Sequence, residues 1–243
     1  MELKGKTAIV TGGGHRVGRA LVLALAEAGC NILLHYNHSA AEAERTAEEA
    51  RRYGVRVFVH QADLARPEEV TALPTLAAEH LDPAQILVNC AAIFPKDTLA
   101  DLTLSAWTET LQTNLQAPVF LTQAFVRALP EQAEAAVVNI TDWRTERPYR
   151  THLSYTVAKG ALDTFTETAA LILAPRVRVN GIALGAMLPP PDRDQAYLDA
   201  LVATIPLQRA GGTQVIADTL LYLLRNDFVT GEIIRLSGGA HLK

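Results

Sequence analysis

Short apolar runs rich in β-branched residues alternate along this chain with longer segments of helical spacing. The runs that predict strands are Thr7–Thr11, Asn31–Tyr36, Val55–His60, Gln85–Asn89, Ala136–Thr141, Arg176–Ile182 and Glu232–Leu236. Between them, segments such as Val17–Ala28 and Ala40–Tyr53 repeat apolar residues every three or four positions, which predicts helices. Gly29, Gly54 and Pro175 follow such segments, at positions where a helix is expected to end.

Strands that are apolar throughout need cover on both faces of their sheet. The alternation therefore predicts an α/β fold, a Rossmann-like doubly wound seven-stranded parallel sheet with helices on both faces. We find no internal repeat or low-complexity segment and expect one domain over residues 1–243. The irregular stretch Ala183–Arg193 has three consecutive prolines and follows a strand, where ligands bind in such sheets. A mobile lid and a rigid connector both fit it.

Composition narrows the class of protein. Of 243 residues, 49% are hydrophobic and 20% charged, with a net charge of −4. We expect neither nucleic acid nor a membrane surface as partner, and we predict no metal site. The cysteines, Cys30 and Cys90, lie in apolar stretches, which fits a reducing compartment. The N-terminus lacks a signal-peptide pattern and no apolar run could span a bilayer, so we expect a cytoplasmic protein.

A glycine-rich turn directly follows the first predicted strand. It reads Thr11-Gly12-Gly13-Gly14-His15-Arg16-Val17-Gly18 and leads into a helical pattern. Glycines there let the backbone approach a pyrophosphate, whose charge a helix N-terminus stabilises. The turn predicts an NAD(P)-binding domain, and its predicted cofactor contacts are Gly12, His15, Arg16, Val17 and Gly18.

The end of the second strand predicts which cofactor is bound. An NAD site usually has an acidic residue there, but this chain reads His35-Tyr36-Asn37-His38-Ser39, without a carboxylate before Glu42. Donors at these positions, with the Arg16 guanidinium close by, suit the 2′-phosphate of NADPH. The predicted contacts are His35, Asn37, His38 and Ser39. The alternative is that the two histidines are simply polar residues at a strand end.

The segment Tyr155-Thr156-Val157-Ala158-Lys159 lies in a helical pattern that continues to Leu173. Residues four apart share a helix face, so Lys159 is expected near the Tyr155 hydroxyl. A nearby ammonium would lower the pKa of the phenol and make Tyr155 a general acid. Such a pair is usually a solvated helix face, but its place after a glycine turn indicates catalysis.

Several motifs together resemble the short-chain dehydrogenase/reductase family over essentially the whole chain. They are the glycine turn, Asn89-Cys90-Ala91-Ala92, Asn114, the Tyr155/Lys159 pair and Val229-Thr230-Gly231. The resemblance implies that Tyr155 donates a proton, that Lys159 holds the nicotinamide ribose, and that Asn114 supports a water relay. It also implies cofactor contacts at Asp63, Leu64, Asn89, Ala91 and Gly185.

Two departures from the common family pattern point to a subgroup. Arg16 replaces a glycine of the turn, and Asp142 replaces the catalytic serine after the fifth strand. Both resemble the pteridine reductases and the bacterial dihydromonapterin reductases. The likeness extends to Leu34-His35-Tyr36 with Ser39-Ala40, to Phe94 and to the closing Gly238-Gly239-Ala240-His241-Leu242-Lys243.

Reduction of a pterin C=N bond needs hydride at carbon and a proton at the adjacent nitrogen. A carboxyl group at Asp142 can relay that proton and accept hydrogen bonds from the pterin. Phe94 offers an aromatic face for the flat ring, so the predicted substrate contacts are Phe94, Asp142 and Tyr155. The alternatives are core packing for Phe94, and for Asp142 a structural cap or an ion pair with Arg144 or Arg147.

Other functions stay open. In a 3-oxoacyl-carrier or small-ketone reductase of the same family, Thr141 or water would replace the missing serine. A non-catalytic dinucleotide sensor is a remote alternative, because Tyr155, Lys159 and Asn114 are all present. In this family, long helical segments such as Ser105–Leu129 and His152–Ala174 pair across a dyad, which implies a homotetramer, with a dimer as the next alternative.

Overall fold

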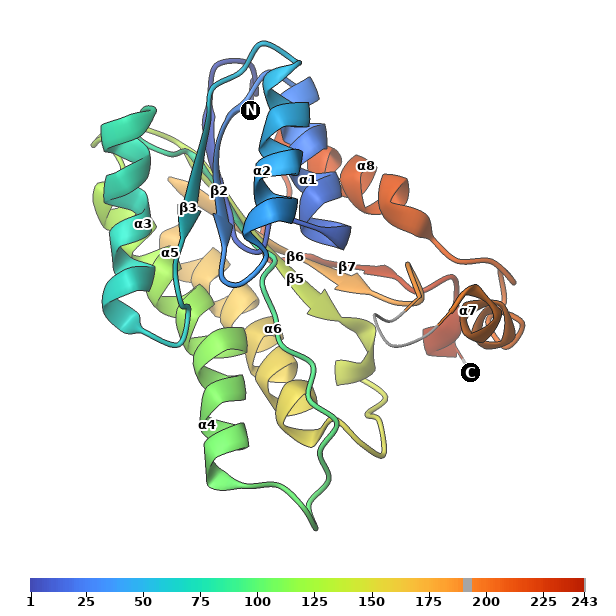
Figure 1. Ribbon diagram of the computed structural model, residues 1–243. Coiled ribbons are helices and arrows are strands. Elements are labelled where there is room, and N and C mark those ends of the chain that lie inside the picture. The colour runs from blue at the N-terminus through green and yellow to red at the C-terminus, as the bar shows by residue number, and fades with distance from the viewer. Residues whose placement is uncertain (190–193, 243) are drawn as a thin grey trace.

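The computed structural model describes residues 1–189 and 194–242 and contains a sheet of seven strands (Figure 1). The strands are β1 (Thr7–Val10), β2 (Asn31–Tyr36), β3 (Val57–Gln61), β4 (Ile86–Asn89), β5 (Ala135–Asp142), β6 (Val177–Leu184) and β7 (Ile233–Leu236). Their order is β3-β2-β1-β4-β5-β6-β7, and every neighbouring pair is parallel. The predicted Rossmann-like doubly wound parallel sheet is confirmed.

Helices cover both faces of this sheet. They are α1 (Arg16–Glu27), α2 (Ala40–Arg51), α3 (Pro67–His80), α4 (Leu104–Leu111), α5 (Ala117–Ala128), α6 (Leu153–Leu173), α7 (Gln195–Val202) and α8 (Gly212–Arg225). Helices α1, α2 and α8 share one hydrophobic core with the sheet, and α3, α5 and α6 share the other (Figure 1).

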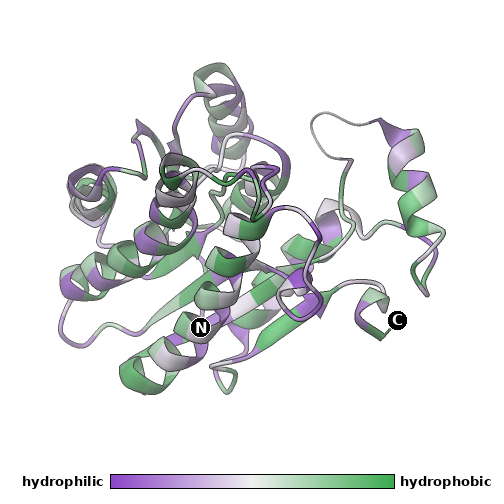
Figure 2. Ribbon diagram, turned by 90° about the horizontal axis from the view of Figure 1, so that it is seen from below, coloured by the Kyte–Doolittle hydropathy of each residue, from purple (hydrophilic) through white to green (hydrophobic). Residues whose placement is uncertain are grey.

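Successive side chains along each strand pack alternately into the two hydrophobic cores. In β1, Ala8 and Val10 point into the core with α1, whereas Ile9 points into the core with α5. Side chains of a strand alternate between its two faces, so only an apolar strand can be buried this way. Figure 2 shows the result as strands coloured largely hydrophobic, between helices of mixed colour.

One predicted helix is interrupted. Instead of a continuous helix over Ser105–Leu129, the chain forms α4, a π-helical turn η1 (Gln112–Gln116), and then α5. A π-turn accommodates one residue more than the α-helical register and is frequent at functional sites. The segment is helical as predicted, but its π-turn was not predicted. The apolar spacing on either side of Gln112–Gln116 is that of an ordinary α-helix and does not reveal the extra residue.

The region after β6 was predicted as a loop. The strand itself extends to Leu184, and residues 190–193 lie outside the described residues, so the choice between lid and connector stays open. Helix α7 follows and packs through Leu198 and Val202 against Ala240 of the C-terminal 3₁₀ turn η3 (Ala240–Leu242).

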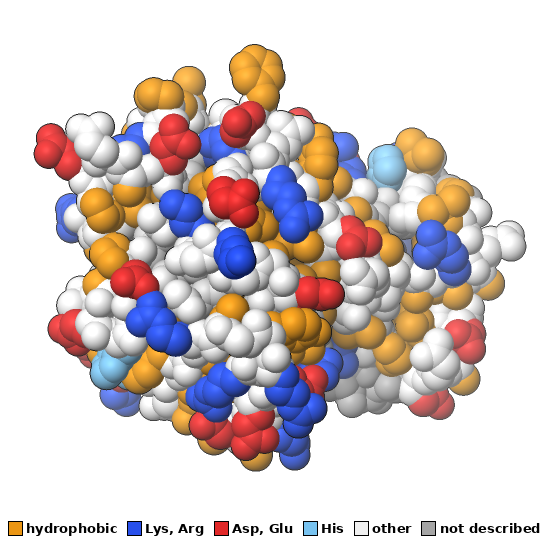
Figure 3. All heavy atoms as spheres, turned by 90° about the horizontal axis from the view of Figure 1, so that it is seen from above, with side chains coloured by type: hydrophobic (Ala, Val, Ile, Leu, Met, Phe, Trp, Pro, Cys, Tyr) orange, Lys and Arg blue, Asp and Glu red, His pale blue; other side chains and the backbone are white. Residues whose placement is uncertain are grey.

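Two surface features bear on the partners. Within residues 1–189 and 194–242, no helix has both the length and the apolar character needed to cross a membrane. On the face shown in Figure 3, basic and acidic side chains lie interspersed rather than gathered by sign.

Candidate active site

The strand order reverses between β1 and β4, and the crevice at the carboxyl ends of these strands is where ligands bind in such sheets. Thr11 ties the two strand ends together. Its backbone N–H donates to Val88 O at 3.0 Å, and its Oγ1 accepts from Cys90 N at 3.0 Å and Ala91 N at 3.1 Å. The glycine turn and the segment 89–92 are therefore held side by side at the bottom of the crevice.

The glycine turn brings the start of α1 against the end of β1. Gly12 has φ +66°, and a Cβ there would lie 2.9 Å from Ala91 Cα. A Cβ at Gly18 would lie 1.9 Å from Gly12 O, so only glycine fits this contact. Helix α1 begins without a side-chain cap and without an acidic residue in its first turn, which leaves its first N–H groups available to an anion.

His35 has a different role from the one predicted. Its side chain is only 1% exposed, its Nδ1 accepts from Gly12 N at 3.1 Å, and its Nε2 lies 3.0 Å from Ala62 O. Burial lowers the pKa of His35 to about 4, so the ring is neutral. The prediction that His35 faces a phosphate is corrected: both ring nitrogens bind the protein, and the imidazole supports the turn.

Arg16 also differs from expectation. It begins α1 in the left-handed region, with φ 52°, and its guanidinium donates to Pro189 O at 2.7 Å in the loop after β6. We had placed this cation beside the end of β2. The structure corrects that placement, because the side chain crosses toward the loop that follows β6.

The other predicted contacts at this end of the sheet lie where β2 and β3 finish. His15 and His38 are exposed, and Asn37 and Ser39 are half-buried. Asn37 Oδ1 accepts from Gln61 Nε2 at 3.3 Å, and Ser39 Oγ would lie 3.2 Å from a Cβ at Gly14. Their contact with a ribose phosphate stays a prediction.

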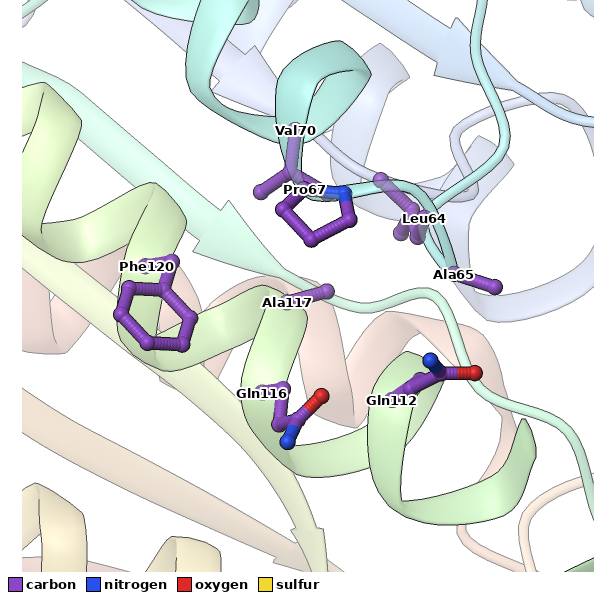
Figure 4. Close-up of a pocket in the computed structure, with 8 residues that line it drawn as sticks. All are labelled: Leu64, Ala65, Pro67, Val70, Gln112, Gln116, Ala117 and Phe120. Carbon is purple, nitrogen blue, oxygen red and sulfur yellow. The ribbon is translucent and has the colours of Figure 1, made fainter. Parts of the chain in front are cut away.

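Asp63 and Leu64, which the family resemblance gives as cofactor contacts, follow β3. Asp63 Oδ1 accepts from Ala65 N at 2.9 Å, and Leu64 is buried. Leu64 also lines a small pocket of about 10 Å³ between the start of α3 and the helical segment 112–120, whose lining includes Gln112, Gln116 and Phe120 (Figure 4). None of the predicted catalytic side chains lines this cavity.

The strand ends below the crevice are joined by buried amides. Asn89 Nδ2 donates to Asn139 Oδ1 at 2.8 Å, and Asn139 Nδ2 donates to Thr166 Oγ1 on α6 at 2.8 Å. Gly185 follows β6, where its N–H donates to Leu236 O at 3.0 Å, and a Cβ on it would lie 2.9 Å from Ser237 Cα. Val17 is half-buried and packs against the core beneath α1.

Tyr155 and Asp142 meet at the carboxyl end of β5. The Tyr155 hydroxyl donates to Asp142 Oδ2 at 3.1 Å, while Asp142 Oδ1 accepts from Arg144 N at 2.8 Å and caps the 3₁₀ turn η2 (Trp143–Thr145). The structural cap is therefore present at Oδ1, while Oδ2 contacts the tyrosine, and the role of Asp142 in proton transfer stays a prediction. Burial raises the pKa of Asp142, which favours a carboxyl that carries a proton.

The pKa of Tyr155 does not follow the prediction. We expected Lys159 to lower it, but burial raises it well above the usual value, and the negative charge of Asp142 raises it further. Tyr155 is 8% exposed and therefore loses solvation if it ionises. The neutral phenol is the resting form in this structure.

Lys159 lies one helical turn beyond Tyr155. Its Nζ donates to Ile140 O at 2.7 Å and stands 5.9 Å from the centroid of the Tyr155 ring. Burial lowers the pKa of Lys159, whereas Cys90 and the carboxylates of Asp142 and Asp163 raise it. The predicted Tyr155–Lys159 pair on α6 therefore lies close to two acidic groups, Asp163 on the same helix and Asp142 at the end of β5.

Asn114 sits in the π-turn η1 and is fully buried. Its Oδ1 accepts from Ile93 N at 2.9 Å, and its Nδ2 donates to Ile93 O at 2.8 Å. The side chain thus fixes the loop that carries Phe94, and the water relay implied for it stays a prediction.

Phe94 lies at the mouth of the site and is 49% exposed, so core packing does not describe it. Its ring stacks on His152 at a centroid distance of 3.8 Å and meets the Tyr155 ring edge-on at 4.5 Å. Tyr149 approaches edge-on at 6.0 Å. Together they make an aromatic wall beside the Tyr155 hydroxyl.

Sequence reasoning missed His152 and Tyr149 in this wall. His152 directly precedes α6 with φ 61°, and its Nδ1 lies 2.7 Å from Pro95 O. A non-glycine residue in the left-handed region often marks a functional site. The sequence could have indicated His152 only by its position three residues before Tyr155.

The residues present fit a dinucleotide. The glycines of the turn let the end of β1 and the start of α1 approach closely, the start of α1 is uncapped, and polar groups lie at the ends of β2 and β3. The described part of the chain holds no group of three or more His, Cys, Asp or Glu residues able to ligate a metal.

Known proteins resemble the chain over nearly its whole length. The family model described as Enoyl-(Acyl carrier protein) reductase matches residues 14–241. The 3-oxoacyl-(acyl-carrier-protein) reductase FabG of Staphylococcus epidermidis is 30% identical over 98% of this chain and 99% of its own length.

Two solved structures were determined with a bound nucleotide. The FolM alternative dihydrofolate reductase 1 from Brucella canis, complexed with NADP, matches with a TM-score of 0.95 at 36% identity, covering 100% of this chain and 96% of that one. A short chain dehydrogenase from Burkholderia cenocepacia, in complex with NADP, matches with a TM-score of 0.91 at 30% identity, covering 99% of both chains.

Proposed function

Because this chain belongs to the short-chain dehydrogenase/reductase family, we propose that it is an NADPH-dependent reductase whose substrate is a pterin. The cofactor proposal rests on the NADP-bound structures of the Brucella and Burkholderia proteins and on the absence of a carboxylate between His35 and Ala40. When bound, NADPH supplies the hydride.

The chain's own residues would hold the cofactor as follows. The N–H groups at the start of α1 would hold the pyrophosphate, and Asn37, His38 and Ser39 would hold the 2′-phosphate. Arg16 takes no part in this set, because its guanidinium is bonded to Pro189 O in the loop after β6. Lys159 would hold the nicotinamide ribose, and Asn89 and Ala91 would border the cofactor at the end of β4.

One observation supports the pterin as substrate: the Tyr155 hydroxyl is hydrogen-bonded to the buried carboxyl of Asp142, beside the exposed ring of Phe94. A carboxyl can pass a proton to a ring nitrogen and can accept hydrogen bonds from ring N–H groups. Phe94 supplies a flat apolar face for a fused ring.

A 3-oxoacyl-carrier or small-ketone reductase is the second candidate, favoured by the FabG relatives at 30% identity. It needs a neutral hydroxyl donor beside Tyr155. Thr141 does not supply one, because its side chain is buried and lies against Asp163 on the α6 side of β5. The dinucleotide sensor is the weakest alternative, since the Tyr155–Asp142 contact is intact.

The test compares substrates on the purified protein. NADPH oxidation is followed by absorbance with dihydrobiopterin or dihydromonapterin and, in parallel, with an acetoacetyl thioester, and NADH replaces NADPH in further runs. We expect turnover with a pterin and NADPH. Asp142→Ser is expected to lower pterin turnover by about a hundredfold or more, the usual contribution of a positioned acid.

Activity should also depend on pH through Asp142. Its pKa is raised and its protonated form is the acid, so pterin turnover is expected to fall as pH rises through that pKa. Thioester turnover that survives in Asp142→Ser, with no pterin turnover in the wild type, would assign the protein to the ketone reductases.

We also propose that the protein forms a homotetramer. Large apolar side chains are exposed on helices of both long segments, including Leu104, Phe120, Leu171 and Ile172. Burying them against a second copy removes apolar surface from water. Light scattering after gel filtration should give four times the mass of one chain, and a monomer mass would contradict the proposal.

A further inference from the structure

Each reductive turnover of the proposed kind removes one proton from the Tyr155–Asp142 pair, and that proton must return from solvent. The pair is poorly placed for direct exchange, because Tyr155, Asp142 and Lys159 are all buried. A substrate seated on Phe94 would cover the mouth as well. The inner side of the site therefore needs a route for protons.

Asp163 lies behind the Tyr155–Lys159 pair on α6 and is half-buried, with its Oδ1 atom buried. It lies four residues beyond Lys159 on α6, so Tyr155, Lys159 and Asp163 follow one another along a single helix face. Its carboxylate raises the pKa of Lys159, and the ammonium of Lys159 in turn lowers the pKa of Asp163. Asp163 has no assigned role in substrate binding, cofactor binding or proton donation.

Two buried side-chain oxygens in this region have no hydrogen-bonding partner among the described residues. One is Oδ1 of Asp163, and the other is Oγ1 of Thr141 on β5. Both belong to one cluster, since the hydroxyls of Thr145 and Thr141 lower the pKa of Asp163. Buried polar atoms of this kind usually bind an ordered water, so the cluster can host a hydrogen-bonded chain.

The cluster also has an outer end. Thr145 belongs to the turn η2 and is half-buried, in contrast to Thr141. The groups that face Asp163 are thus Thr141 from β5, Thr145 from η2, Asp142 from the end of β5 and Lys159 from α6. Burial raises the pKa of Asp163, which lets it carry a proton.

We propose that Asp163 is a positioning residue of the proton supply: with the hydroxyls of Thr141 and Thr145, it forms a path that returns a proton from solvent to Lys159 and Tyr155. The inference rests on the proposed function only in that the protein is an NADPH-dependent reductase, whether its substrate is a pterin or a ketone.

The steps balance as follows. Hydride adds to a substrate carbon, and the neighbouring nitrogen or oxygen takes the proton held by Tyr155 and Asp142. Lys159 passes an ammonium proton to the Tyr155 oxygen, and the Asp163 carboxyl gives its proton to Lys159. Water near Thr145 protonates Asp163 again. One proton from solvent is consumed in each turnover.

The test is Asp163→Asn, which keeps the shape of the side chain but cannot carry the proton. In rapid-mixing experiments the first oxidation of bound NADPH should keep its wild-type rate, because it uses the proton already stored. Later turnovers should slow about tenfold, and the solvent isotope effect on kcat should rise. The Kd for NADPH should not change.

Glu167→Gln is the matched control, since it makes the same chemical change on the exposed part of α6 and should leave both phases unchanged. Thr145→Val should reproduce the slow later turnovers and replaces Asp163→Asn in the test if that variant does not fold. Wild-type later turnovers, or equal slowing of the first turnover, overturn the proposal. The assay uses whichever of pterin or thioester the wild type reduces, so a wrong pterin assignment shows separately.

Discussion

Tyr155→Phe is expected to lower kcat by about 10²–10⁴-fold, the range that a positioned general acid contributes. The hydroxyl is the only group removed, and its partner in the structure is Asp142 Oδ2 at 3.1 Å. The phenyl ring keeps its edge-on contact with Phe94 at 4.5 Å, so the aromatic wall stays intact. Steady-state kinetics together with the Kd for NADPH, which should be unchanged, would measure the effect.

Tyr149→Phe is the matched control for this prediction. Tyr149 contacts the same Phe94 ring at 6.0 Å, but its hydroxyl does not meet Asp142 in a hydrogen bond. Its loss should change kcat by no more than about threefold, as expected for a group outside the proton transfer. Similar losses in both variants would mean that the aromatic wall, rather than the Tyr155 proton, limits the reaction.

Gly18→Ala should weaken NADPH binding by about a hundredfold and reduce the free energy of unfolding by about 3 kcal/mol, the upper part of the usual range for overpacking. The added methyl carbon would stand 1.9 Å from Gly12 O, a backbone atom that cannot move without displacing the turn. Because Gly12 N also donates to His35 Nδ1, the displacement would reach the end of β2. Fluorescence titration and thermal unfolding measure the two effects.

Gly160→Ala adds the same methyl group in the middle of α6, where nothing lies within 4 Å of the new Cβ. It should bind NADPH normally and gain up to about 1 kcal/mol of stability, because alanine favours a helix over glycine. If Gly18→Ala binds NADPH as well as Gly160→Ala does, the tight glycine contact has no part in the cofactor site.

The sheet could be predicted from the sequence because its strands are buried on both faces and therefore apolar at nearly every position. The seven runs fall on the seven strands, with ends that differ by a residue or two. The π-turn at Gln112–Gln116 could not be predicted, because one additional residue in a helix leaves no mark in composition. The family resemblance identified Asn114 as a candidate catalytic residue, but it did not indicate that Asn114 lies in a π-turn.

The site divides in the same way. Tyr155, Lys159 and Asp142 were found because their spacing and order carry information, and the structure brings them together. His35 and Arg16 were misplaced because a sequence shows which groups are polar, not whether the chain folds back over them. The predicted pKa of Tyr155 failed for a related reason: burial and the nearby Asp142 raise it, and neither can be read from the spacing of Tyr155 and Lys159.

The π-turn also bears on how this chain can change over time. Deleting one residue between Gln112 and Gln116 would let α4 and α5 join as a regular helix, which generally has better hydrogen bonds. The same deletion would rotate one side of the helix by about 100° and take Asn114 away from Ile93. Selection for stability alone would remove this residue, so its persistence would record selection for the loop that carries Phe94.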